Sequence, residues 1–156
     1  MVSIRPYLAQ DRQACHAIFE SNCPKYFDAD EIVGLENWLN GQDSGQITYQ
    51  TSSADYFYVL EENLEIQACG GFYIVKDKPN VNMVWGMVNQ NHHKKGYGSL
   101  LFQHRINQIK MLYSEYKIVL DTSQHTYSFF EKFGFKIHKI TKDEYGPGLD
   151  RYDMSF

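Results

Sequence analysis

The 156-residue chain lacks several features that would assign it to a special class of protein. It has only three cysteines, Cys15, Cys23 and Cys69, and their spacing matches neither a CxxC motif nor a metal site, which indicates free thiols in a reducing compartment. No stretch approaches the roughly 20 apolar residues of a membrane span. The first residues also lack the apolar core of a signal peptide. These absences predict a cytoplasmic protein without a membrane partner.

Positive charge is scarce as well. The chain has 15 Lys and Arg against 19 Asp and Glu, a net charge of −4, and this argues against a nucleic-acid partner because phosphate backbones need a basic surface. His92, His93 and His104 do not have the spacing of metal ligands, so no metal is expected. The length and the apolar fraction of 43% predict a single domain over residues 1–156.

What the chain does contain is one segment of unusual composition, 89–101, which runs Asn-Gln-Asn-His-His-Lys-Lys-Gly-Tyr-Gly-Ser-Leu-Leu. An apolar run over 81–88 precedes it, and an amphipathic helix is expected to follow. Gly96 and Gly98 allow the backbone to approach a ligand closely, and the free N–H groups of a helix start favour an anion. Four side chains could add positive charge or hydrogen bonds: His92, His93, Lys94 and Lys95. The segment predicts a pyrophosphate site for a nucleotide-like cofactor.

The remaining patterns predict a mixed sheet with helices around it. Strands are expected at 2–7, 56–61, 66–76, 81–88, 117–121, 135–141 and 150–156. Helices are expected at 11–20, 28–39, 97–113 and 125–133. The polar segment 41–53 is expected to be a loop, and Gly70-Gly71 indicates a bulge or a close backbone approach. The fold class is therefore α/β (α+β mixed), with about 6–7 strands and about four helices.

The buried side of the helix expected at 97–113 is predicted from its apolar spacing. Its members are Leu100, Leu101, Ile106, Ile109 and Leu112.

Two segments in this order resemble the motifs of the GNAT superfamily of acyl-CoA N-acyltransferases. Residues 88–98, Val-Asn-Gln-Asn-His-His-Lys-Lys-Gly-Tyr-Gly, are similar to its acyl-CoA motif, in which an Arg or Gln and then x-x-Gly-x-Gly/Ala follow a strand. Residues 129–135, Phe-Phe-Glu-Lys-Phe-Gly-Phe, resemble its second signature, Phe-Tyr-Glu-Lys-x-Gly-Phe. The expected strands and helices fit that fold over nearly the whole chain.

The resemblance implies a GNAT-like fold and an enzyme that transfers an acetyl group from acetyl-CoA directly to a primary amine. It places the cofactor in a gap between the strands that end at Val88 and Asp121, with main-chain groups near Met87 and Val88 against the pantetheine arm. It assigns the pyrophosphate to the amides of 93–99. The cofactor-binding residues it implies are Met87, Val88, His93, Lys94, Lys95, Gly96, Tyr97, Gly98, Ser99 and Ser123.

The chain departs from the family pattern at three positions. His93 stands where the family has Arg or Gln, and Ser123 where an asparagine often contacts pantetheine. Phe130 stands where a tyrosine often protonates the departing thiolate, and phenylalanine has no proton to give. Tyr127, one helical turn earlier, is the candidate for that catalytic role. The missing tyrosine keeps open an alternative function, a non-catalytic acyl-CoA-binding or sensing module.

Other interpretations fit less well. No Lys-Ser/Thr follows the glycines as in a Walker A loop, and Leu101 occupies the third glycine position of a dinucleotide fingerprint. Asp121, Ser123 and His125 contain the residue types of a hydrolase triad, but Ser123 is in no Gly-x-Ser-x-Gly motif. The general base is not assigned, and Glu31 and Glu61 are only candidates. The acceptor stays open between a small-molecule amine and a peptide amine, as do the acyl chain length and a homodimer.

Overall fold

The computed structural model describes all 156 residues and contains one seven-stranded sheet. Its strands are β1 (Val2–Pro6), β2 (Ser52–Glu62), β3 (Glu65–Val75), β4 (Asn80–Val88), β5 (Lys117–Thr122), β6 (Lys136–Gly146) and β7 (Leu149–Ser155). They lie in the order β1-β2-β3-β4-β5-β7-β6. Every neighbouring pair is antiparallel except β4 and β5, which are parallel. A parallel pair needs a crossover connection, which is supplied by a helix.

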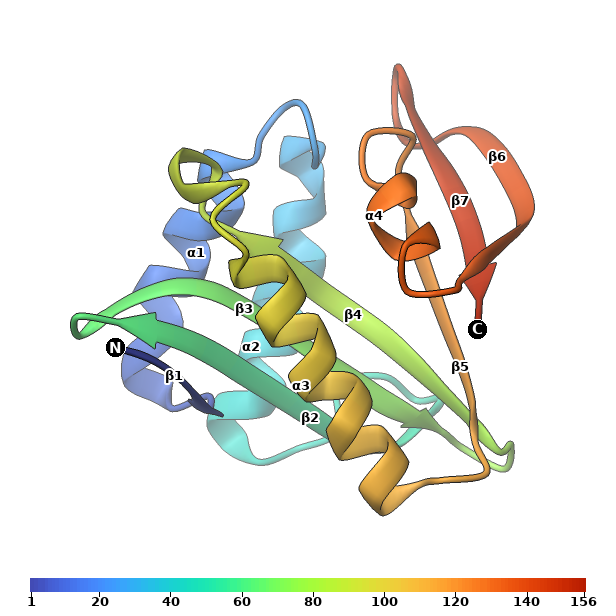
Figure 1. Cartoon of the computed structure of the whole chain (residues 1–156), viewed down its shortest axis with the longest axis horizontal. Coiled ribbons are helices and arrows are strands. Elements are labelled where there is room, and N and C mark those ends of the chain that lie inside the picture. Colours follow the sequence, from blue (N-terminus) through green and yellow to red (C-terminus); the bar gives the residue numbers. More distant parts are fainter.

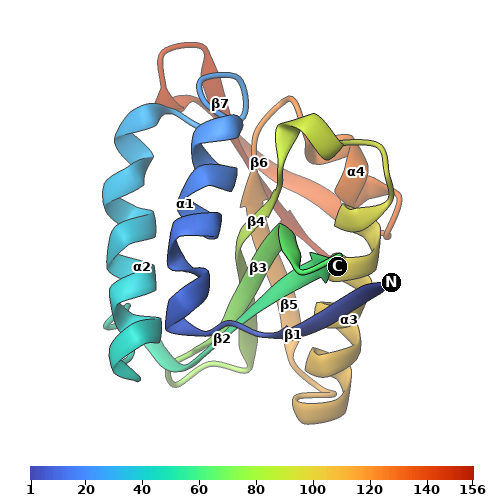
Figure 2. The same ribbon diagram turned by 90° about the vertical axis from the view of Figure 1, so that its left-hand side faces the viewer.

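Helices cover both faces of the sheet. The α-helices are α1 (Arg12–Ser21), α2 (Ile32–Ser44), α3 (Tyr97–Leu112) and α4 (Tyr127–Glu131). Helices α1 and α2 lie side by side on one face, and α3, the crossover between β4 and β5, lies on the other (Figures 1 and 2). Short 3-10 turns occur at Ala9–Asp11, Ala29–Glu31 and Gln90–His92. None of these helices has the combination of length and apolarity that crossing a bilayer requires.

Each face has its own apolar core. The larger core packs α3 against the sheet through residues such as Phe72, Phe102 and Ile109, all nearly inaccessible to solvent. The second core lies under α1 and α2 and includes Phe19 and Trp38. Because successive strand residues point to opposite faces, the central strands β3 and β4 contribute to both cores.

All seven expected strands and all four expected helices are present, and the mixed α/β class is confirmed. Three details of the prediction were wrong. Helix α2 continues to Ser44 and ends at left-handed Gly45, so only 46–51 of the expected loop separates it from β2. Helix α4 is only five residues long. Leu100 and Leu112 are about half exposed, at 49% and 50%.

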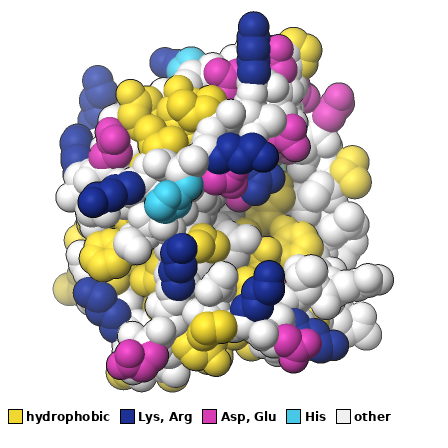
Figure 3. All heavy atoms as spheres, turned by 90° about the vertical axis from the view of Figure 1, so that its right-hand side faces the viewer, with side chains coloured by type: hydrophobic (Ala, Val, Ile, Leu, Met, Phe, Trp, Pro, Cys, Tyr) yellow, Lys and Arg dark blue, Asp and Glu magenta, His cyan; other side chains and the backbone are white.

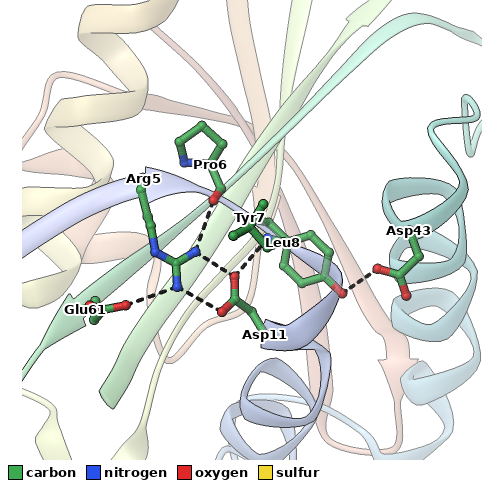
Figure 4. A network of polar contacts seen from close by, with 7 residues as sticks. All are labelled: Arg5, Pro6, Tyr7, Leu8, Asp11, Asp43 and Glu61. Carbon is green, nitrogen blue, oxygen red and sulfur yellow. Dashed lines mark hydrogen bonds and ion pairs between the residues drawn. The ribbon is translucent and has the colours of Figure 1, made fainter. Parts of the chain in front are cut away.

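A polar network attaches β1, an edge strand, to the rest of the fold (Figure 4). The Arg5 guanidinium donates hydrogen bonds of 2.8 and 2.9 Å to the two carboxylate oxygens of Asp11 and one of 3.0 Å to Glu61. Asp11 is almost completely buried and also accepts the Leu8 N–H at 2.8 Å. Glu61, one of the two candidate bases, is therefore part of this structural network.

Candidate functional site

The sheet splits between its two parallel strands. Strands β4 and β5 are paired only at Asn80–Lys117, Val81–Ile118 and Asn82–Val119. Beyond these pairs β5 continues against β7, while β4 continues against β3, and the two strands diverge (Figure 1). One edge of β4 is consequently unpaired up to Val88, and a ligand can bind along it as an additional strand would.

A bulge lies in this unpaired part of β4. Trp85 and Gly86 together oppose Gly70 of β3, and Trp85 has a left-handed φ of 51°. A bulge leaves the extra residue out of the ladder and redirects its main-chain groups. The bulge expected at Gly70-Gly71 of β3 is thus on the neighbouring strand, because the extra residue belongs to β4. The expected close approach is confirmed, because a Cβ on Gly70 would lie 2.8 Å from Cζ of Arg105.

The segment after β4 presents unused N–H groups at the open end of the split. Lys94 and Gly96 adopt left-handed φ angles of 68° and 84°, which turn the chain into α3. None of the six successive main-chain N–H groups from Lys94 to Ser99 donates a hydrogen bond within the protein. Consecutive free N–H groups at a helix start form an anion site. The free N–H groups of 94–99, called the cradle below, are thus available to an anion, whereas the His93 N–H donates to Gln90 at 3.4 Å.

The side chains of this segment differ in what they offer to a ligand. Lys94 and Lys95 are exposed, and the Lys95 ammonium lies 3.1 Å from Nδ1 of His92. Tyr97 is buried, and its hydroxyl donates to Glu62, away from the cradle. Ser99 is exposed in the first turn of α3. The positive charge at the cradle comes from the two lysines.

His93 folds back onto the end of β4. Its Nε2 lies 3.0 Å from the Val88 carbonyl, which also accepts a 2.8 Å hydrogen bond from the Asn22 side chain. The Asn89 N–H donates to Gln67 of β3. In an antiparallel pair, successive residues of a strand direct their main-chain groups alternately toward and away from the partner strand. The main-chain groups of Val88 therefore point away from β3, toward the split. The Met87 side chain is buried beneath α1 and α2. Because Asn22 and His93 already occupy the Val88 carbonyl, the Val88 N–H is the main-chain group left for a ligand.

Gly98 joins three elements at the mouth of the split. A Cβ there would lie 3.5 Å from Val88 of β4 and 3.7 Å from the Phe129 ring of α4. These are ordinary contact distances, and the backbone of Gly98 has no positive φ. The protein itself therefore has room for a β carbon at this position.

The second motif lies on the opposite wall. Ser123 is buried, and its hydroxyl accepts the His125 main-chain N–H at 3.2 Å, so these residues form a local turn rather than a hydrolase triad. Phe130 packs edge-on against Phe102 at 5.2 Å in the larger core. The Tyr127 ring stacks on Tyr152 at 4.9 Å, and its hydroxyl has no hydrogen-bond partner in the protein. Tyr127 is thus a free hydroxyl near this wall.

The connection between α1 and α2 crosses the split. The Tyr26 ring packs edge-on against His93 at 5.1 Å and against His125 at 6.1 Å, and so bridges the two loops that follow β4 and β5. Asp28 lies against the end of β6, since a Cβ on Gly146 would lie 2.3 Å from its carboxylate. These contacts partly roof the split.

A carboxyl cluster lies beneath these contacts, and only its member Glu31 is among the candidate bases named from the sequence. Glu31 accepts the Asp28 N–H at 2.8 Å, and burial, reinforced by the charges of Asp28 and Asp121, raises the pKa of Glu31 to about 7. Asp121, at the end of β5, accepts the hydroxyl of Tyr145. Burial next to Asp121 raises the pKa of Tyr145. Glu31 is therefore a carboxyl that can take up a proton near neutral pH.

The surface beside Asp121 is hollowed. A hollow of about 230 Å³ is lined by ten residues, among them Asn82, Val119, Asp121, Arg151 and Asp153. Viewed from the side of β5–β7, the surface shows a recess with hydrophobic side chains inside and charged side chains of both signs around it (Figure 3).

A sheet split between two parallel strands, with a free-amide helix start beyond the split, is the arrangement that the resemblance to the GNAT superfamily implies. A family model described as an acetyltransferase (GNAT) domain matches residues 53–137, more than half of the chain. The chain belongs to the GNAT acetyltransferase family, as its two motifs indicated.

Solved structures agree with this assignment at the level of the fold. A protein described as a GNAT-family acetyltransferase from Desulfovibrio desulfuricans superposes with a TM-score of 0.80 at 16% identity, over 100% of this chain and 98% of that one. The ribosomal-protein-S18-alanine N-acetyltransferase of Escherichia coli has a TM-score of 0.76 at 16% identity, over 100% and 93% of the two chains.

The acetyltransferase yncA from Salmonella typhimurium, described with acetyl-CoA as its cofactor, has a TM-score of 0.76 at 18% identity with the same coverage of 100% and 93%. No curated protein sequence matches the chain.

Proposed function

We propose that the protein is an N-acetyltransferase that transfers an acetyl group from acetyl-CoA directly to a primary amine. The observation that carries the proposal is the run of six free N–H groups, 94–99, at the open end of the split between β4 and β5. The solved structure from Salmonella, described with acetyl-CoA, and the Escherichia coli alanine N-acetyltransferase support the choice of donor and of an amine acceptor.

The donor would extend along the unpaired edge of β4. Its pyrophosphate would accept hydrogen bonds from the cradle, with Lys94 and Lys95 adding charge. A pantetheine carbonyl would accept the Val88 N–H, with Ser123 on the opposite wall. The thioester would then lie beside the Trp85–Gly86 bulge, where a main-chain N–H outside the ladder can polarise its carbonyl.

The chemistry then requires two proton movements. Glu31 takes the proton from the acceptor ammonium, because burial places its pKa at about 7. The neutral amine attacks the thioester carbonyl carbon, the C–N bond forms, and the C–S bond breaks with its electron pair on sulfur. Tyr127 is the proposed proton donor to that sulfur.

Direct transfer is favoured over a covalent enzyme intermediate by the state of the cysteines. Cys15 and Cys69 are completely buried in the core under α1. Burial raises the pKa of the half-buried Cys23 thiol, and the nearby Glu31 raises it further. A thiol that remains protonated is a poor nucleophile.

A second candidate function is a module that binds acyl-CoA without turning it over. The observation that favours it is Phe130, which occupies the family's tyrosine position and packs against Phe102 without any proton to donate. Both candidates use the same cradle, so binding of the donor does not separate them.

Two measurements in sequence test these functions. Calorimetry with acetyl-CoA comes first, and a CoA-release assay over amines, polyamines, amino acids and peptides follows. We expect micromolar binding and turnover with at least one acceptor class. Binding without turnover on any acceptor would favour the sensing module, and no heat on titration would contradict both functions.

A further inference from the structure

Arg105, in the middle of α3, is a buried cation without an ionic partner. Its residue is only 4% exposed, and no carboxylate lies within ion-pair distance of it. Its one hydrogen bond runs from Nη1 to the Gly71 carbonyl at 3.0 Å, and its buried Nε has no partner. An unpaired charge inside a protein is destabilising, and an apolar side chain of similar size would fill this space at less cost.

The guanidinium lies against the bulge of β4. A Cβ on Gly70 would be 2.8 Å from its Cζ, and a Cβ on Gly86 would be 2.8 Å from its Nη2. The absence of side chains on these two glycines is what lets the cation reach the backbone of the sheet. Gly86 is itself exposed, in the part of β4 that has no neighbouring strand. Only the thickness of the main chain separates the positive charge from the split.

No anionic group neutralises this charge, and the ring of Phe102 lies beside the guanidinium, with its centroid 5.4 Å from Cζ. Burial lowers the pKa of Arg105 to about 10, so the guanidinium is protonated at neutral pH. On β3, Cys69 keeps its proton, because its hydrogen bond to Cys15 and its burial raise its pKa. On α3, burial lowers the pKa of His104, and the charge of Arg105 lowers it further. The charge of Arg105 is therefore not neutralised by a carboxylate or a thiolate, and its field acts on the bulge of β4.

We propose that Arg105 is an electrostatic positioning residue that stabilises the negative charge formed on the thioester carbonyl oxygen and the departing CoA sulfur. The inference rests on the proposed function and extends it to a residue outside both family motifs. When the amine attacks, the carbonyl electron pair moves to oxygen, and when the C–S bond breaks, its pair moves to sulfur. Both charges form next to the bulge, and Phe130 supplies no proton to relieve the second.

The pKa of the thiol of bound CoA measures the effect of the Arg105 charge, and this measurement needs no amine substrate. Ultraviolet absorbance of the thiolate, followed against pH, gives the thiol pKa in the complex of the enzyme with CoA. We expect it to lie below that of free CoA in the wild type. In Arg105→Met it should rise by about one unit, since an opposite charge at short range shifts a pKa by one to three units. The kcat/KM for acetyl-CoA should fall about 100-fold, the scale of losing one oxyanion stabiliser.

A second variant separates charge from structure. Arg105→Gln keeps an N–H donor for the Gly71 carbonyl but carries no charge, so it should raise the thiol pKa as much as Arg105→Met does. Ile109→Val, one helical turn away and equally buried, should leave it unchanged. Arg105→Met should also resist urea at least as well as the wild type, because it removes an uncompensated buried charge.

The outcomes are distinguishable. Folded Arg105→Met and Arg105→Gln variants that bind CoA with an unchanged thiol pKa would overturn this inference alone. A raised thiol pKa in Arg105→Met together with a wild-type value in Arg105→Gln would also overturn the inference. It would show that Arg105 acts only through its hydrogen bond to the Gly71 carbonyl. A wild type that does not bind CoA would overturn the proposed function, and the inference with it.

Discussion

A β carbon added to Gly98 would lie 3.5 Å from Cγ2 of Val88. The first turn of α3 and the end of β4 are therefore separated by about the width of one side chain. Both residues were predicted to contact the cofactor, and the structure brings them together at the mouth of the split. A β carbon on Gly98 meets these neighbours at ordinary contact distances. A substitution at Gly98 is therefore a direct test of the cradle.

Gly98→Val should lower the affinity for CoA by ten-fold or more while the protein stays folded. The added branched side chain would occupy the space that the pantetheine-pyrophosphate junction needs, and a ten-fold loss corresponds to about 1.4 kcal/mol. Calorimetry with CoA measures the affinity, and circular dichroism checks the fold. Leu100→Val is the matched control, because it places the same side chain in the same helical turn at an exposed position. Equal affinities for CoA in the two variants would contradict the assignment of the cradle as the pyrophosphate site.

Much of this region could be predicted from the sequence because glycines, lysines and a strand–helix junction carry a local signal. Glu31 and Arg105 have no such local motif. The carboxyl of Glu31 acquires its raised pKa from burial beside Asp28 and from Asp121, which is ninety positions away in the chain. The proximity of Glu31 and Asp121 depends on how the helices pack on the sheet. A single sequence has no local pattern that predicts it.

The spacing of Arg105 within its helix is, however, visible in the sequence. Arg105 lies four residues after Leu101 and four before Ile109, so helical spacing places it at the centre of the buried face. The prediction instead chose the apolar residues Leu100 and Leu112, which the structure leaves half exposed. A charged residue on a buried helical face is itself an observation that calls for a function.

Glu31→Gln should abolish the dependence of the rate on a group that titrates near pH 7. In the wild type, kcat/KM should rise as the pH passes through about 7, because Glu31 must lose its proton before it can accept one from the ammonium. The glutamine variant should be slower by about 100-fold at pH 8, with that limb of the profile missing. A pH–rate profile with the best acceptor measures both. An unchanged limb would assign the base to another group.

The same residue should affect stability with a defined sign. The pKa of Glu31 is about 7 in the fold against 4.5 as its ordinary value, so the folded state holds its proton more tightly. Its contribution to stability is complete below about pH 4.5 and is lost as the pH rises through about 7. Relative to the wild type, Glu31→Gln should therefore gain stability at pH 8, by about 1 kcal/mol after allowance for solvent screening. Urea unfolding at pH 5 and pH 8 gives the comparison.

Tyr127→Phe tests the proposed proton donor. The substitution keeps the ring that stacks on Tyr152 and removes only a hydroxyl without a partner in the protein, so the fold should not change. We expect the rate to fall by about ten-fold or more with thioesters of poor leaving groups, and much less with good ones. Tyr152→Phe, which removes a hydroxyl from the other ring of the stack, is the control. If Tyr127→Phe matches the wild type across the thioester series, Tyr127 is not the acid.

Asp11→Asn tests the network that holds the edge strand β1. Burial alone would raise the pKa of Asp11, but the hydrogen bonds from Arg5 and Leu8 hold it below the ordinary value of 3.8. The carboxylate thus stabilises the fold fully above about pH 3.8, and this stabilisation is lost as the pH falls through the lower folded-state pKa.

Replacing Asp11 with asparagine leaves the Arg5 charge without its main partner and should cost about 2–3 kcal/mol at pH 7. Urea unfolding measures the loss, which should shrink steadily below about pH 3.8 as the wild-type carboxylate takes up its proton. Glu61→Gln is the matched comparison. It removes one single 3.0 Å bond to the same guanidinium from a more exposed side chain, so it should cost less than about 1 kcal/mol. Equal losses in the two variants would show that Asp11 has no special role in anchoring β1.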